Sequence, residues 1–155
     1  MFHYKFKFSW IGLIIFILPM LINIVFFMVH PAEEMQTNKQ VNRMIEMVEQ
    51  VTRMLYAIEI CILVSTKKIE VKSPYLYLGI VFLVLYYIVW IRDFAGGMKT
   101  ELMCKSFMFV PIPLAVFPVL YFIFAALWLH NGLAVITMCI FGIAHYIVSV
   151  QSFAK

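Results

Sequence analysis

The last part of the chain contains no formally charged side chain. From Ser106 to Ala154 the sequence has no Asp, Glu, Lys or Arg. This stretch is long enough for two helices of about 20 residues, the length that crosses ~30 Å of hydrocarbon. A soluble domain is about half apolar and a quarter charged, whereas this chain is 65% hydrophobic and only 13% charged. The sequence therefore predicts an integral membrane protein.

Apolar runs of helical length divide the chain into a regular series. We predict an all-α integral membrane protein, a single domain built as a bundle of about five transmembrane helices that cover residues 8–29, 44–66, 75–92, 107–129 and 133–151. Proline removes a helical hydrogen bond and bends the helix around it. Kinks are accordingly expected at Pro19 and, in the fourth span, at Pro111, Pro113 and Pro118, where the first half of the span should be bent or unwound. These three prolines of the fourth span are also the candidates for a gating element, the alternative being plain kinks.

The second expected span differs from the others because it carries charges. Helical spacing places most polar side chains of Asn38–Thr66 on one face, while Glu59 projects from the apolar side. Counted back from Lys67 at 1.5 Å per residue, Glu59 lies ~12 Å and Arg53 ~21 Å into the helix. Both are inside the hydrocarbon if this helix spans the bilayer. The alternative is an amphipathic helix that lies flat at the interface, but Tyr56–Val64 is apolar around almost its whole circumference, which favours spanning.

Charged groups inside a membrane are costly, by about 2.5–3.5 kcal/mol each on insertion scales, and they indicate function. In a five-span arrangement several polar side chains lie at a similar depth in the membrane. This arrangement predicts a polar cavity. The expected ligand or ion pathway is lined by Glu49, Arg53, Glu59, Asn23, Tyr56, Tyr86 and His145. Arg53 would pair with an anionic group, and Glu59 would carry a proton or a cation. Two alternatives remain: Glu49 and Arg53, four residues apart, form a structural ion pair, and His145 is a packing residue.

Sequence motifs of catalysis are absent from the chain. It has no HExxH, no GxSxG, no phosphate-binding loop and no Asp-rich metal motif. Cys61, Cys104 and Cys139 are far apart and are expected to be apolar fillers. His30, His145 and Glu49 would reach a metal only from three separate segments at no diagnostic spacing. We therefore predict no enzyme, no metal site and no cofactor, and the dispersed net charge of +4 does not indicate nucleic-acid binding.

Basic residues flank the expected spans on both sides. One side receives Lys5, Lys7, Lys67, Lys68 and Lys72, and the other receives Lys39, Arg43, Arg92, Lys99, Lys105 and Lys155. The positive-inside rule gives the first helix most weight, and the acidic Glu33 and Glu34 follow that helix. We expect a cytoplasmic N-terminus in the plasma membrane, with dual insertion as an antiparallel dimer as the alternative.

Two segments carry a resemblance to known proteins. FSWIGLIIFILPMLINIVFF, near the start, and FVPIPLAVFPVLYF resemble a set of small multi-pass membrane proteins of Gram-positive bacteria. The resemblance covers most of the chain and implies the plasma membrane as location. No activity is known for that set, so the resemblance assigns no site residue.

Two classes of function fit these features. The first is a protein of the lipid bilayer that binds or transports a small solute, ion or proton through the polar cavity, as a homodimer if it transports. The second is a non-transporting accessory subunit or self-immunity factor that docks a partner membrane protein through Lys39–Glu49 on the charged helix.

Overall fold

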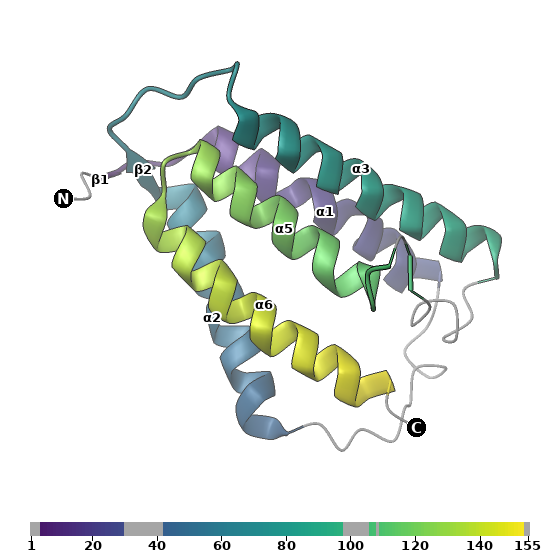
Figure 1. The fold of residues 1–155 in the computed structure, drawn as a ribbon. Helices are drawn as coiled ribbons and strands as arrows, with labels where there is room; N and C mark the ends of the chain where they lie inside the picture. The colour runs from purple at the N-terminus through teal and green to yellow at the C-terminus, as the bar shows by residue number, and fades with distance from the viewer. Residues whose placement is uncertain (1–3, 30–41, 98–105, 108, 154–155) are drawn as a thin grey trace.

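The computed structural model describes residues 4–29, 42–97, 106–107 and 109–153 (Figure 1). Over these residues it contains five helices and two short strands. The helices are α1 (Trp10–Val29), α2 (Arg43–Ile62), α3 (Pro74–Ala95), α5 (Pro113–Trp128) and α6 (Gly132–Phe153), and the strands are β1 (Tyr4–Phe6) and β2 (Leu63–Ser65). Each helix falls on one predicted span, so the helical fold is confirmed. Among the described helices α3 and α6 are long and apolar enough to cross a membrane, which gives weak support for a membrane location.

The helices form two groups. In Figure 1, α1, α3 and α5 run together, while α2 and α6 lie along each other. α5 packs against both α3 and α6 and so connects the groups. One hydrophobic cluster, which includes Ile15, Tyr56, Phe122 and Met138, joins α1, α2, α5 and α6, and a second, which includes Phe26, Tyr86, Trp90 and Phe117, joins α1, α3 and α5.

A two-stranded sheet closes one end of the fold. β1 and β2 pair antiparallel, with Lys5 opposite Val64. The pairing continues past the strands, because the Lys7 amide donates to the Ile62 carbonyl at 3.0 Å and the Ser9 amide to the Cys61 carbonyl at 2.7 Å. The sequence predicted a helix as far as residue 66, and this boundary is wrong. The residues after Ile62 are extended because the N-terminal strand supplies their hydrogen-bond partners.

The prolines of the fourth span do not act alike. Pro118 lies inside α5, and Pro19 inside α1, as predicted. Pro111 precedes α5, and Pro113 occupies its first turn, where the missing amide hydrogen breaks no helical bond. The helix therefore begins at Pro113 and not at residue 107. The described residues before Pro113 are not helical, which agrees with the expected unwinding, but Pro111 and Pro113 do not kink a helix. Ile112, at φ 48°, turns the chain into the helix.

Candidate functional site

Glu49 lies at the centre of a polar contact between α2 and α6. Its side chain is a carboxylate, yet the residue is only 4% exposed. Its Oε1 accepts a hydrogen bond from the Arg53 guanidinium, one turn later on α2, and lies 3.1 Å from His145 Nδ1 on α6. The Arg53 guanidinium lies over the Phe141 ring, 5.6 Å from its centroid, and Phe141 stacks on the His145 ring. One carboxylate oxygen thus holds two basic groups from two helices.

Arg53 is the member of this cluster best placed to meet a ligand. Its side chain is 42% exposed, against 5% for the Glu49 side chain. A guanidinium has five N–H donors and no acceptor, and the ion pair with Glu49 occupies only part of that capacity. Glu49 and the Phe141 ring fix the orientation of the group, while its open side is turned outward. Such a fixed, partly open guanidinium can pair with a carboxylate or phosphate group.

Glu59 lies nearer the other end of α2, at the same helix pair. Its Oε1 accepts a hydrogen bond of 3.0 Å from the Thr137 hydroxyl of α6. Its Oε2 is buried and has no hydrogen-bond partner among the described residues. A buried oxygen without a partner costs free energy that a proton or a bound cation removes. Glu59 therefore has an open position for either.

Asn131 is a residue that the sequence reasoning missed. It is buried in the turn between α5 and α6, and its Nδ2 donates to the backbone carbonyls of Glu59 at 2.9 Å and of Leu63 at 3.0 Å. Its Oδ1 accepts from the Ala134 amide and so caps the start of α6. An asparagine before a predicted helix signals the cap, but nothing in the sequence signals the contact with α2. This side chain joins the end of α2 to the start of α6 beside Glu59.

Three of the predicted pathway residues lie elsewhere. The Tyr86 hydroxyl donates to Asn23 Oδ1 at 2.8 Å, so these two side chains join α3 to α1. Tyr56 is completely buried, and its hydroxyl donates to the Phe122 carbonyl of α5 at 2.8 Å. The structure therefore brings Glu49, Arg53, Glu59 and His145 together along the α2–α6 contact, which we call the polar seam. It places Asn23, Tyr56 and Tyr86 in helix-to-helix contacts outside this seam.

Two cavities of the described fold have apolar linings. A groove of about 300 Å³ between α2 and α6 is lined by Met44, Ile45, Val48, Ile140, Ile143, Ala144 and Ile147. A smaller cavity of about 120 Å³ lies among α1, α3 and α5, next to Tyr121. Neither is lined by residues of the polar seam, so the polar cavity expected from the sequence is not one of these two. Within the described ranges, no three His, Cys, Asp or Glu side chains lie close enough to hold a metal ion.

Several residues used in the sequence analysis lie outside the described ranges. They include His30, Lys39, Cys104 and the acidic pair Glu33 and Glu34. Comparisons of the chain with protein-family models, with characterised proteins and with solved structures gave no match. The resemblance to small membrane proteins of Gram-positive bacteria stays a prediction, and the function rests on the geometry of the polar seam.

Proposed function

We propose that this chain is a multi-pass protein of the plasma membrane whose five helices cross the bilayer, and that it binds or transports a small solute or ion along the polar seam. The observation that carries the proposal is the orientation of α2. Its buried positions are Glu49, Thr52, Tyr56 and Ile60, so two polar residues are buried with two larger apolar ones, whereas its methionines and most of its aliphatic residues are exposed. Met54, for example, is 67% exposed. In water an amphipathic helix turns its apolar face inward. The reverse arrangement suits a bilayer, where apolar side chains meet lipid and polar groups satisfy one another.

The exposed surfaces of the other helices also fit a lipid bilayer. In the candidate spans of α3 and α6 only 22% and 28% of the residues are buried, and the others are half-buried or exposed. α1 exposes Ile14, Ile17, Leu21 and Ile24 at helical spacing. Soluble proteins rarely expose such continuous apolar surface. In a bilayer it becomes the lipid-facing surface of the bundle.

Helix lengths fit this arrangement. α1 and α2 have 20 residues each and therefore measure about 30 Å, the thickness of the hydrocarbon core. α5 has 16 residues, or about 24 Å, and is the most enclosed of the five described helices. Before α5 the chain turns, and the amide groups of Phe107 and Val110 each donate to the carbonyl of the other residue. Such irregular backbone is acceptable at membrane depth where protein covers it.

Each residue of the polar seam has a distinct role in this proposal. Arg53 offers its outward donors to the anionic group of a solute, and Glu49 with His145 holds the guanidinium in position. Glu59 binds a proton or a cation at its open oxygen. The apolar outer faces of α2 and α6 leave room for a homodimer, which transport by so small a chain would need.

The test compares two adjacent positions on α2 that face different surroundings. In a background without Cys61, Cys104 and Cys139, Arg53→Cys and Met54→Cys are labelled in native membranes with a water-soluble maleimide. Both side chains are exposed in the structure, but Met54 faces outward from the bundle and Arg53 faces the seam. We expect Arg53→Cys to react and Met54→Cys to be protected by lipid. Glu59→Cys then reports how far the water-accessible part of the seam extends.

Two outcomes contradict the proposal in different ways. Reaction at both positions means that α2 is not surrounded by lipid. Protection at both positions means a sealed ionic core, and the second function then takes precedence, a non-transporting protein that docks a partner. The exposed side chains of Arg43 and Glu46, at the start of α2, are the observation that favours this second function. They belong to the segment expected to dock, whose first residues, 39–41, lie outside the described ranges.

A further inference from the structure

All five lysines of the described residues lie at one end of the fold. Lys5 and Lys7 precede α1, and the pairing of β1 with β2 brings them beside the segment that leaves α2. That segment, residues 66–73, carries Lys67, Lys68 and Lys72. We call these five side chains the lysine end. All of them are exposed, and Glu70 is the one acidic residue in the same described segments.

The lysine end is held in place by contacts with the helices. The Trp128 indole N–H donates to the Glu70 carbonyl at 2.8 Å and so ties the segment to the end of α5. The Lys67 amide donates to the Ser65 hydroxyl at 3.3 Å. On the other strand, the Lys7 amide bonds the Ile62 carbonyl. The backbone that carries the ammonium groups is thus anchored, while the side chains themselves reach outward.

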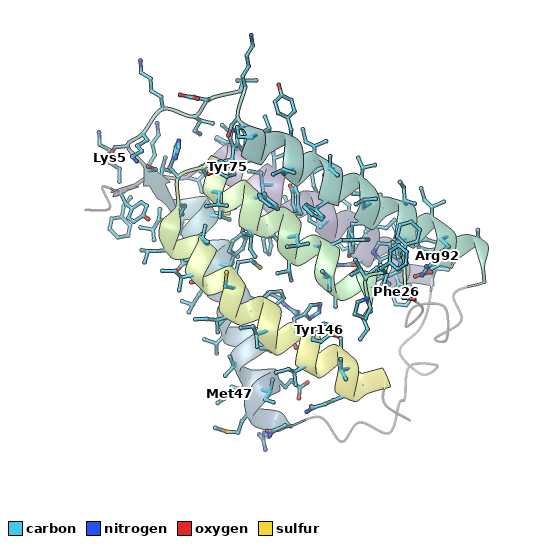
Figure 2. All side chains as sticks on the ribbon, viewed as in Figure 1. Lys5, Phe26, Met47, Tyr75, Arg92 and Tyr146 are labelled. Carbon is cyan, nitrogen blue, oxygen red and sulfur yellow. The ribbon has the colours of Figure 1, made fainter. Side chains whose placement is uncertain are left out.

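Exposed aromatic rings accompany the lysines. Phe6 is 85% exposed, Phe8 and Trp10 are exposed with their ring centroids 5.0 Å apart, and the exposed Tyr75 lies in the first turn of α3 at the same end. Figure 2 shows Lys5 and Tyr75 at the end of the fold opposite Arg92 and Phe26. Aromatic side chains beside basic residues are typical of the depth at which lipid headgroups lie. The rings enter the boundary of the acyl chains, and the longer lysine side chains reach past them.

Charge is distributed differently at the other end of the described fold. There Arg92 pairs with Asp93 at 2.9 Å, and Arg43 is accompanied by Glu46 one turn later on α2. Positive charge in the described residues is therefore balanced at that end and in excess at the lysine end. Within the described ranges, exposed ammonium groups and exposed aromatic rings occur together at the lysine end.

We propose that the lysine end binds the headgroups of anionic phospholipids and prefers them to zwitterionic ones. Each lysine near an anionic surface adds attraction that is screened by salt. The partner is a lipid surface because the ammonium groups are spread over two segments and flanked by rings that need an apolar neighbour. The inference rests on the membrane location in the proposed function, but it does not depend on the solute or on the polar seam.

The experiment measures which lipids stay with the purified protein. Protein in mild detergent is mixed with equal amounts of phosphatidylglycerol and phosphatidylcholine, and native mass spectrometry counts each retained lipid. We expect the wild-type chain to retain mainly phosphatidylglycerol. The triple variant Lys67→Gln, Lys68→Gln, Lys72→Gln is expected to lose this preference by roughly tenfold or more, since each lysine accounts for up to about fivefold. Circular dichroism confirms that each variant stays helical.

Two matched variants separate charge from other effects. Replacing the same three lysines by arginine keeps the charge and is expected to keep the preference. Arg43→Gln removes one exposed positive charge at the opposite end of α2 and is expected to leave the preference within a factor of two of wild type.

The outcomes also separate this inference from the proposed function. Equal retention of both lipids by the wild-type chain, or an unchanged preference in the glutamine variant, overturns the anionic-headgroup assignment while leaving the membrane location intact. Retention of neither lipid contradicts the membrane location itself. Displacement of phosphatidylglycerol by soluble glycerol phosphate shows a site for a free phosphate group, and that result also overturns the assignment to a lipid surface.

Discussion

A side chain of α5 replaces the hydrogen bond that a proline removes from α1. Pro19 has no amide hydrogen, so the carbonyl of Ile15, four residues earlier, loses its helical donor. The Tyr121 hydroxyl of α5 donates to that carbonyl at 3.0 Å, in the buried contact between the two helices. The Tyr121 phenol of α5 thus replaces the backbone amide donor that Pro19 does not supply in α1.

This repair predicts that Pro19 and Tyr121 are coupled. Tyr121→Phe leaves the Ile15 carbonyl buried without a partner and is expected to lower the free energy of unfolding by about 1–3 kcal/mol. In a Pro19→Ala background the amide of the new alanine occupies the carbonyl, so the same change is expected to cost at most half as much. The measurement is a double-mutant cycle from unfolding in detergent.

The control for this cycle is Tyr146→Phe, because Tyr146 is exposed on α6 (Figure 2). It is expected to change the free energy of unfolding by less than about 0.5 kcal/mol. Equal costs of Tyr121→Phe with and without Pro19 contradict the repair.

The sequence predicted contacts within a helix better than contacts between helices. The ion pair of Glu49 with Arg53 follows from their spacing of four residues, and the structure confirms it. The partners of Glu59 and Tyr56 were not predictable, because Thr137 and the Phe122 carbonyl become neighbours only through the packing of whole helices. A helical wheel assigns a face to a residue, but it does not say which helix covers that face.

Glycine sets how closely two elements approach each other. A Cβ atom on Gly12 would lie 2.0 Å from the Ile60 carbonyl oxygen, so α1 contacts the backbone of α2 directly at this point. A Cβ on Gly142 of α6 would lie 2.6 Å from Val119 Cγ1, which is a side-chain atom and can move. On α3, a Cβ on Gly79 would meet its nearest neighbour at 3.7 Å, an ordinary contact.

These distances predict opposite effects of the same substitution at two glycines. Gly12→Ala is expected to lower the free energy of unfolding by about 1–3 kcal/mol, because the backbones of α1 and α2 must separate. Gly79→Ala is expected to be neutral or to stabilise by up to about 1 kcal/mol, since alanine is the better helix former and has space. Thermal unfolding of both variants in one detergent gives the comparison. A Gly12→Ala protein as stable as the Gly79→Ala protein contradicts the close approach of α1 and α2.

At the scale of elements, the positions of the helices were predicted but several ends were not. Apolar length located α1, α3 and α6 to within a few residues of their observed bounds. The predicted C-terminal end of α2 and the predicted start of α5 were wrong, because these boundaries depend on hydrogen bonds to β1 and on the local turn before Pro113. β1 takes the residues after Ile62 into a sheet, and the turn at Ile112 delays α5 until Pro113.

The whole molecule combines a polar seam between α2 and α6 with an apolar outer surface. Arg53 of the polar seam and the lysine end lie at different positions along α2. Arg53 is near the middle of the helix, and the lysine end is beyond its C-terminal end. At about 1.5 Å per residue, Arg53 lies roughly 14 Å from Ile62. An arginine side chain cannot reach the headgroups over that distance. If α2 spans the bilayer, the positive charge of the guanidinium is therefore compensated by the polar seam and its ligand. If α2 lies flat at the interface, the charge needs neither of them.

The two arrangements predict different sidedness for the ends of α2. In a background free of cysteine, Arg43→Cys and Lys67→Cys are treated with a membrane-impermeant maleimide, first in sealed inside-out vesicles and then in intact cells. A spanning α2 places the two positions on opposite sides, because about 30 Å of helix separates Arg43 from Ile62. We expect Lys67→Cys to react only in inside-out vesicles and Arg43→Cys only in intact cells, with both reacting after detergent is added. Reaction of both positions from one side means that α2 lies at the interface, and the chain then cannot carry a solute along the polar seam.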